Sequence, residues 1–162
     1  YDEPTFKKWS IGKAKAYRRL VGESAKAMPG AIDLVLSVAE KFPIALATGS
    51  RRSDVNAAFE VLANGKLKKV FQTIITSDDV SRPKPDPATY LKAVEDLGLP
   101  AQNCLAIEDS HNGVSSAKNA GMRVLGITAI HNASSLHEAD WHLGSLENLS
   151  AYNLISMFEK DK

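Results

Sequence analysis

Short apolar runs alternate with amphipathic stretches through most of this chain, and this alternation limits the folds that it can adopt. Four runs have the length of buried strands: Ile44–Thr48, Thr73–Thr76, Cys104–Glu108 and Val124–Thr128. Between them, apolar residues recur at the three- and four-residue spacing of helices. Because strands that alternate with helices at short intervals build parallel sheets covered by helices, the sequence predicts an α/β fold.

The amphipathic stretches also predict which residues face the core. The expected packing residues are Ile32, Val35, Leu36 and Ala39 in the first stretch; Val55, Ala58, Phe59 and Leu62, with Gly65 near the helix end, in the second; Tyr90, Leu91, Val94 and Leu97 in the third; and Leu154, Ile155 and Phe158 in the last. Pro87 at the first position of the third helix, with Asp86 as its cap, marks where that helix begins.

Two carboxylates directly follow the third apolar run, at Glu108 and Asp109. Ligands of open parallel sheets bind beyond the carboxyl ends of strands, so this pair is placed for chemistry. Adjacent carboxylates at such a position are hard oxygen ligands suited to Mg²⁺. The alternative is structural, because Asp109 or Ser110 could simply cap the helix that follows.

Two further segments carry groups that bind anions. The run Ile44–Thr48 ends in Thr48-Gly49-Ser50, where a hydroxyl and flexible amides can face an anion at a helix N-terminus. Lys84 is held between two prolines. Taken alone, the alternative interpretation is that it is an ordinary solvated lysine of a loop. A fixed cation, a hydroxyl and a carboxylate pair are what a phosphoryl group needs around it.

In order and spacing these segments resemble the haloacid dehalogenase superfamily, in its β-phosphoglucomutase-like and phosphoglycolate-phosphatase-like branch. Thr48 matches the second motif of the family, Lys84 the third, and Glu108 with Asp109 the fourth. The residues that match the flanking pattern are Met28-Pro29-Gly30, Ser110, Gly113, Ala117, Ala120, Gly121, Met122, Ala139-Asp140 and Ser145–Leu149. The resemblance implies a Rossmann-like parallel sheet with flanking helices over residues 28–162, preceded by the end of a small helical cap over residues 1–27.

The first motif of that family has no counterpart here. It is an apolar strand that ends in Asp-x-Asp, and its first Asp is the nucleophile. The ten aspartates lie at positions 2, 33, 54, 78, 79, 86, 96, 109, 140 and 161, and no two are separated by a single residue. The resemblance places the absent strand in the middle of the sheet, between Ile44–Thr48 and Cys104–Glu108. Its removal would leave two rows of backbone groups unpaired inside a buried sheet.

We therefore expect these 162 residues to be part of a longer polypeptide, clipped or disordered at its amino terminus, or to receive the strand from a second chain. A chain that naturally starts at Tyr1 would have to close the two flanking strands together or borrow a neighbour. By this expectation the 162 residues alone are inactive.

With the strand supplied, the resemblance implies a Mg²⁺-dependent phosphatase that works through an aspartyl-phosphate. Thr48, Gly49 and Ser50 would bind phosphoryl oxygens, Lys84 would balance charge, and Asp109 with Glu108 would hold the metal ion. Asn112 lies close enough to these motifs to contact substrate, as do Arg51 and Arg52. Three functions stay open: hydrolysis of a small phosphorylated metabolite such as a sugar phosphate, a sugar phosphomutase, and a truncated domain that only binds or assembles.

Composition excludes several other classes of protein. With 20 basic and 19 acidic residues the net charge is +1, which predicts neither a nucleic-acid partner nor an anionic membrane surface. The single Cys104 excludes an internal disulfide, as expected for a cytoplasmic protein. No Gly-Lys-Ser/Thr phosphate loop or G-x-G-x-x-G motif occurs. His111, His131, His137 and His142 lack metal-ligand spacing and are interpreted as surface or packing residues.

Overall fold

The computed structural model describes residues 25–129 and 133–160, together with residues 3, 5, 11, 12, 16 and 19–21; the side chains of residues 63, 64 and 160 are not described. Most of the predicted cap segment, 1–27, and His131 lie outside the described residues, so the predictions made for them stay predictions.

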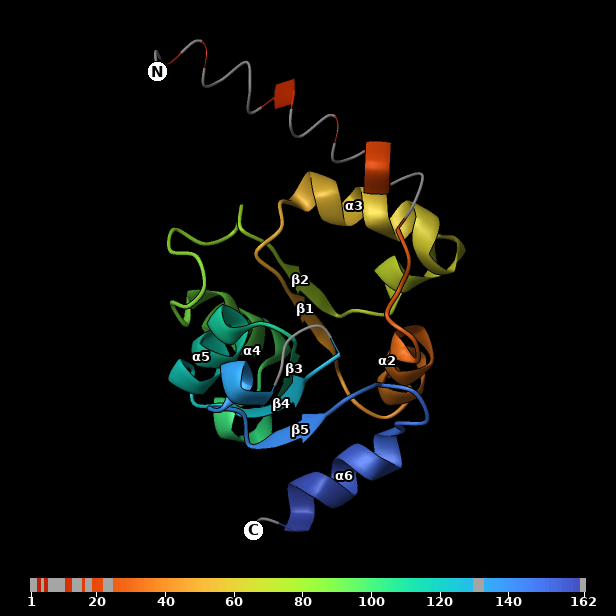
Figure 1. Ribbon diagram of the computed structural model, residues 1–162, viewed down its shortest axis with the longest axis vertical. Helices are drawn as coiled ribbons and strands as arrows, with labels where there is room; N and C mark the ends of the chain where they lie inside the picture. Colours follow the sequence, from red (N-terminus) through yellow and green to blue (C-terminus); the bar gives the residue numbers. More distant parts are fainter. Residues whose placement is uncertain are drawn as a thin grey trace.

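The described strands are parallel and form two sheets (Figure 1). β1 (Ala45–Ala47) pairs with β2 (Thr73–Ile75), while β3 (Leu105–Glu108), β4 (Arg123–Ile127) and β5 (Trp141–Leu143) form the second sheet in that order. Within the described ranges no strand pairing joins β1 to β3, so each of these two strands has one unpaired edge. The predicted α/β class and parallel pairing are confirmed, and β5 is a strand that the sequence analysis did not predict.

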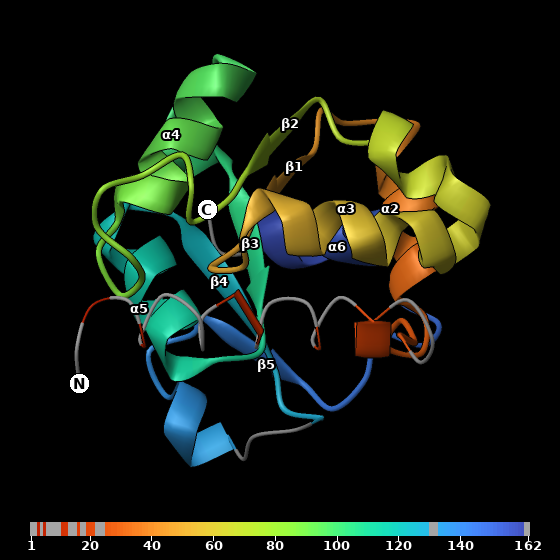
Figure 2. The same cartoon turned by 90° about the horizontal axis from the view of Figure 1, so that it is seen from above.

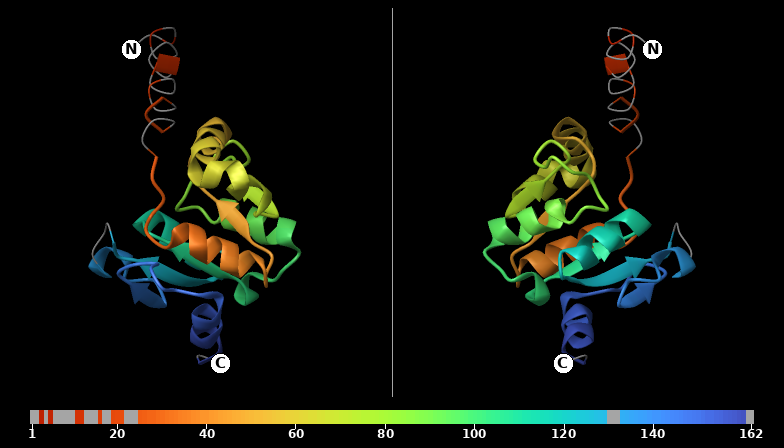
Figure 3. Two further views of the ribbon diagram at one scale, coloured as in Figure 1. Left: turned by 90° about the vertical axis from the view of Figure 1, so that its right-hand side faces the viewer. Right: turned by 90° about the vertical axis from the view of Figure 1, so that its left-hand side faces the viewer.

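Helices cover both faces of the strands. They are α2 (Ala31–Ala39), α3 (Arg52–Val61), α4 (Ala88–Leu97), α5 (His111–Asn119) and α6 (Ala151–Lys160), with the 3₁₀ segments η1 (Leu62–Lys69), η2 (Ala101–Asn103) and η3 (Ala133–Leu136). α4 and α5 lie on one side of the strands, and α2 and α6 on the other (Figure 2). α3 and η1 lie at one end of the molecule and α6 at the other (Figure 3). None of these helices combines the length and the apolar character that a bilayer crossing requires.

The strand β4 explains why two helical layers are needed. Val124 packs in the cluster under α4 and α5, whereas its neighbour Leu125 packs in the cluster under α2 and α6. Both side chains are fully buried. Because successive side chains of a strand point to opposite faces, a strand that is apolar throughout needs cover on both sides.

Two expected core positions are wrong. Leu36 of α2 and Leu91 of α4 are 40% and 47% exposed. α2 packs Leu34 against the β4 side and Ile32 with Val35 against α3, which turns Leu36 outward. Periodicity identifies an apolar stripe, but only the neighbouring elements decide which part of the stripe is covered.

Candidate active site

A cleft of about 530 Å³ opens at the carboxyl ends of β1 and β3. Its lining residues are Leu46, Ala47, Thr48, Gly49, Pro83, Lys84, Ile107, Glu108, Asp109, Ser110 and Asn112. Of the site residues proposed from the sequence, Thr48, Gly49, Lys84, Glu108, Asp109 and Asn112 line this cleft, whereas Ser50, Arg51 and Arg52 do not. Ser50 adjoins the lining, because its backbone N–H donates to Thr48 Oγ1 at 3.1 Å. Three segments distant in sequence are thus brought to one place.

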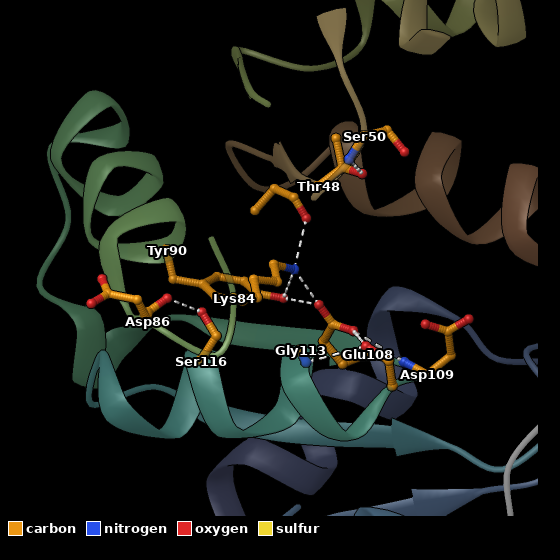
Figure 4. A network of polar contacts seen from close by, with 11 residues as sticks. Thr48, Ser50, Lys84, Asp86, Tyr90, Glu108, Asp109, Gly113 and Ser116 are labelled. Carbon is orange, nitrogen blue, oxygen red and sulfur yellow. Dashed lines mark hydrogen bonds and ion pairs between the residues drawn. The ribbon is translucent and has the colours of Figure 1, made fainter. Parts of the chain in front are cut away.

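Lys84 is fixed at the floor of this cleft. Its Nζ donates to the backbone carbonyl of Ala47 at 3.1 Å and to the Tyr90 hydroxyl at 3.3 Å, and it forms an ion pair with Glu108 (Figure 4). The loop that carries Lys84 is tied to α5, because the buried Ser116 hydroxyl donates to the carbonyl of Asp86 at 2.7 Å. The lysine therefore bridges the end of β1 and the end of β3.

Both carboxylate oxygens of Glu108 are occupied by protein donors. Oε1 accepts from Lys84 and, at 2.6 Å, from the Tyr90 hydroxyl. Oε2 accepts from the Ser110 hydroxyl and the Asp109 backbone N–H, both at 3.3 Å. The Glu108 side chain is 9% exposed, and the ion pair with Lys84 supplies the counter-charge that a buried carboxylate needs. It lies over Gly113, where any Cβ would overlap the carboxylate.

Tyr90 is the functional residue that sequence reasoning missed, since its spacing indicated only core packing. Its ring is 6% exposed and lies 4.4 Å from the Lys84 ammonium, a cation–π distance. Burial, followed by the Glu108 charge, raises the pKa of the Tyr90 hydroxyl far above its usual range. The hydroxyl is therefore a permanent donor to Glu108.

The sequence left open whether Asp109 or Ser110 caps the helix α5, and the structure assigns the cap to Ser110. Ser110 caps α5, because its hydroxyl accepts from the Gly113 N–H at 3.1 Å. The Asp109 carboxylate has no hydrogen-bond or ion-pair partner among the described residues, and it lies half-buried at the cleft. α4 begins at Ala88, one residue later than predicted, so Pro87 and not Asp86 holds the N-cap position. Asp86 lies just before it and accepts from the Ala88 N–H at 2.9 Å.

The Thr48–Ser50 turn is held from the neighbouring strand end. Ser77 N–H donates to the Ser50 carbonyl at 3.0 Å, and Arg52 donates to Asp79 Oδ2 at 2.6 Å. Hydrogen bonds from Thr76, supplemented by the charge of Arg52, lower the pKa of Asp79. Arg52, which the sequence suggested as a substrate contact, is thus engaged in positioning the turn.

The remaining reactive side chains are not part of the cleft lining. His111 and His137 stack on each other with ring centroids 6.3 Å apart, and the His142 ring contacts the Leu136 carbonyl at 2.9 Å. Cys104 is buried, and burial raises the pKa of its thiol. Among the described residues no group of three or more His, Cys, Asp or Glu side chains is arranged to hold a metal ion by itself.

Comparison with known proteins identifies the family. The model of haloacid dehalogenase-like hydrolases matches residues 2–127, well over half of the chain. This chain belongs to the haloacid dehalogenase-like hydrolase family. The predicted resemblance is confirmed, and the match spans the strand ends that form the cleft.

Several curated relatives of this chain are named as phosphatases. CbbY of Rhodobacter capsulatus is 35% identical over 121 residues, covering 74% of this chain and 53% of the relative. Hexitol phosphatase A of Escherichia coli is 35% identical over 129 residues, covering 79% of this chain and 58% of the relative. CbbY of Rhodobacter sphaeroides, solved with xylulose-(1,5)bisphosphate, superposes with a TM-score of 0.78 at 28% identity, covering 90% of this chain and 67% of that one. The chain thus spans little more than half the length of these curated relatives.

Proposed function

We propose that the complete protein is a Mg²⁺-dependent phosphatase that hydrolyses phosphomonoesters of small metabolites, sugar phosphates or similar compounds. The observation that carries the proposal is the convergence of Thr48, Lys84 and Asp109 on one cleft between β1 and β3. Hexitol phosphatase A and the CbbY complex with xylulose bisphosphate support a phosphorylated sugar as substrate.

The charges of the cleft support a divalent cation. Lys84 and Glu108 compensate each other, which leaves the Asp109 carboxylate without a counter-charge among the described residues. An anionic phosphoryl group beside it would add repulsion unless a cation is bound. Mg²⁺ needs only one or two carboxylates because water and substrate oxygens complete its shell. Asp109 fits this role better than Glu108, whose oxygens already accept from Lys84, Tyr90 and Ser110. When bound, the ion would neutralise charge on the phosphoryl oxygens.

The other cleft residues bind the phosphoryl group. Thr48 Oγ1 accepts from the Ser50 N–H, so the Thr48 hydroxyl hydrogen is left to donate to a phosphoryl oxygen. The Gly49 amide lies beside it at the start of an exposed turn. Lys84, at the floor, stabilises the negative charge that these oxygens share with the attacking group. Asn112 is placed for a substrate hydroxyl, since it lines the cleft from the first turn of α5.

We propose that the attacking carboxylate is carried by a strand outside these 162 residues, which pairs with β1 and β3. Lys84 contacts the last residues of β1 and β3, two strands that lack a partner on one edge in the part of the chain that the structure describes. Ile107 is 37% exposed although it lies within β3. Unpaired backbone groups inside a covered sheet are costly, so a strand that satisfies both edges is strongly favoured. The carboxylate would attack phosphorus as the bond to the ester oxygen breaks, and that oxygen would take up a proton and leave as an alcohol. Water would then hydrolyse the acyl phosphate, which regenerates the carboxylate and releases inorganic phosphate.

The test is phosphate release by the protein that carries this strand. We expect Mg²⁺-dependent hydrolysis of a panel of hexose, hexitol and pentose phosphates. Lys84→Ala and Asp109→Asn should each lower kcat/KM by at least about 100-fold. The first removes a cation that stabilises the transition state, and the second removes the carboxylate proposed to hold the metal ion. Lys92→Ala on α4 and Asp33→Asn on α2, both outside the cleft lining, are the matched controls. Full turnover by either cleft variant would contradict the assignment.

Product analysis separates the alternatives. Isomerised sugar phosphate in place of free phosphate would identify a phosphomutase. Absence of turnover, together with tight binding of a strand peptide, would identify a binding or assembly module. A cytoplasmic location stays a prediction.

A further inference from the structure

Tyr90 connects the two charged groups at the floor of the cleft. It is the third residue of α4, and its side chain reaches past the start of that helix to the ends of β1 and β3. The hydroxyl accepts from Lys84 Nζ at 3.3 Å and donates to Glu108 Oε1 at 2.6 Å. Both hydrogen-bonding functions of the hydroxyl are therefore directed at charged partners of opposite sign.

This contact is built into the fold. The ring is 6% exposed and belongs to the cluster that holds Val94, Cys104 and Val114, so it cannot rotate away without opening the core. The same ring lies 4.4 Å from the Lys84 ammonium. A rigid, buried ring whose hydroxyl contacts two long charged side chains is suited to hold those side chains in one arrangement.

We propose that Tyr90 is a positioning residue of this phosphatase site, whose hydroxyl holds Glu108 and Lys84 in the geometry that places the ammonium beside the transferring phosphoryl group. Glu108 acts in the same arrangement, as the anchor of Lys84 more than as a metal ligand. The role rests on the proposed function, because Lys84 is assigned there to the phosphoryl oxygens.

The substitution Tyr90→Phe tests the hydroxyl alone, because it removes the hydroxyl and keeps the packing and the cation–π contact of the ring. Hydrogen bonds to charged groups contribute about 1.5–3 kcal/mol, so we expect kcat to fall about 10- to 100-fold. KM should change by less than about threefold, because the interaction with Lys84 is realised in the transition state and not in initial binding. In a Glu108→Gln background the same change should have much less effect, since the hydroxyl acts through Glu108.

A second measurement does not depend on turnover. Reductive methylation of the full protein, quantified by mass spectrometry, reports the accessibility of the Lys84 ammonium, which is 11% exposed at the side chain. Tyr90→Phe should raise the methylation rate of Lys84 several-fold relative to Lys92. Tyr152→Phe, on α6 and 74% exposed, is the control and should change neither rate nor kcat.

The outcomes distinguish this proposal from the proposed function. Wild-type kcat and an unchanged Lys84 methylation rate in Tyr90→Phe overturn the positioning role, whatever happens to the melting temperature. A lower melting temperature with wild-type kcat and methylation means that Tyr90 only packs, and also overturns it. If the wild-type protein releases no phosphate, the proposed function fails, and the methylation rates alone decide whether Tyr90 positions Lys84.

Discussion

Gly113 of α5 offers the sharpest test of how the cleft is built, through the substitution Gly113→Ala. In an ordinary helix this change stabilises by about 1 kcal/mol, because alanine has the higher helix propensity. Here the new Cβ would overlap the Glu108 carboxylate, so the Glu108 side chain would have to move. It would leave the Tyr90 hydroxyl and the Lys84 ammonium without their carboxylate partner.

The size of the effect follows from these two contacts. The side chains of Lys84 and Glu108 are only 11% and 9% exposed, so water does little to replace what is lost. Hydrogen bonds to charged groups contribute about 1.5–3 kcal/mol each, and the gain in helix propensity offsets about 1 kcal/mol of that loss. We therefore expect Gly113→Ala to lower the free energy of unfolding by about 2–5 kcal/mol.

Urea unfolding followed by tryptophan fluorescence measures this change directly. For a chain of this size the expected loss corresponds to a fall in Tm of roughly 4–20 °C. Gly144→Ala is the control, because its Cβ meets nothing within 4 Å. In a Glu108→Ala background, Gly113→Ala should be neutral or stabilising. A wild-type or higher Tm for the single variant, or an equal loss in the Glu108→Ala background, would refute the reasoning.

Three further predictions concern stability. Gly30→Ala should cost at least about 2 kcal/mol in urea unfolding, because Gly30 has a φ of 79° and its Cβ would overlap the backbone of Leu146; an unchanged midpoint would contradict this. Leu125→Ala should lower the free energy of unfolding by about 2–5 kcal/mol in the same measurement, since the side chain is fully buried. A loss below about 1 kcal/mol would contradict this, because it would mean that neighbouring side chains move in and fill the cavity. Partial burial raises the pKa of Asp140, but the hydrogen bond from Lys118 and further contacts outweigh it, so the net shift is downward. The stabilisation from Asp140 is therefore full above the unfolded pKa of about 3.9 and lost as pH falls through the lower folded value. Unfolding midpoints measured from pH 7 to pH 2.5 should fall less in Asp140→Asn than in wild type. An equal fall in both proteins would contradict the role assigned to Asp140.

Much of the fold could be predicted because its elements are marked locally. The apolar runs around β1, β2, β3 and β4 and the cap at Ser110 each depend on a few neighbouring residues. β5 escaped prediction because Trp141-His142-Leu143 is interrupted by a histidine and is not a continuous apolar run, so no local pattern marked it as a strand. Leu36 and Leu91 were misplaced because exposure depends on distant elements that cover a helix, and local spacing carries no information about those elements.

The members of the candidate site could be predicted from the sequence, but their separate roles could not. The positions of Thr48, Lys84 and Asp109 in the sequence indicated which groups would gather, since the carboxyl ends of parallel strands meet at one edge. The separate roles of Glu108 and Asp109 were not predictable, because two adjacent carboxylates are equivalent until their partners are known. The same holds for Arg52, whose partner Asp79 comes from the next strand end.

By itself, then, the sequence determined the chemistry that is available at the strand ends and the α/β class, because short-range patterns set strands, helices and caps. The tertiary structure alone decided how that chemistry is used. Lys84 meets a carboxylate 24 residues away, and Tyr90 meets the same carboxylate across 18 residues. Those contacts occupy Glu108 and leave Asp109 open to the cleft. Contacts between distant residues arise only when the whole chain packs, and so they lie beyond any local pattern.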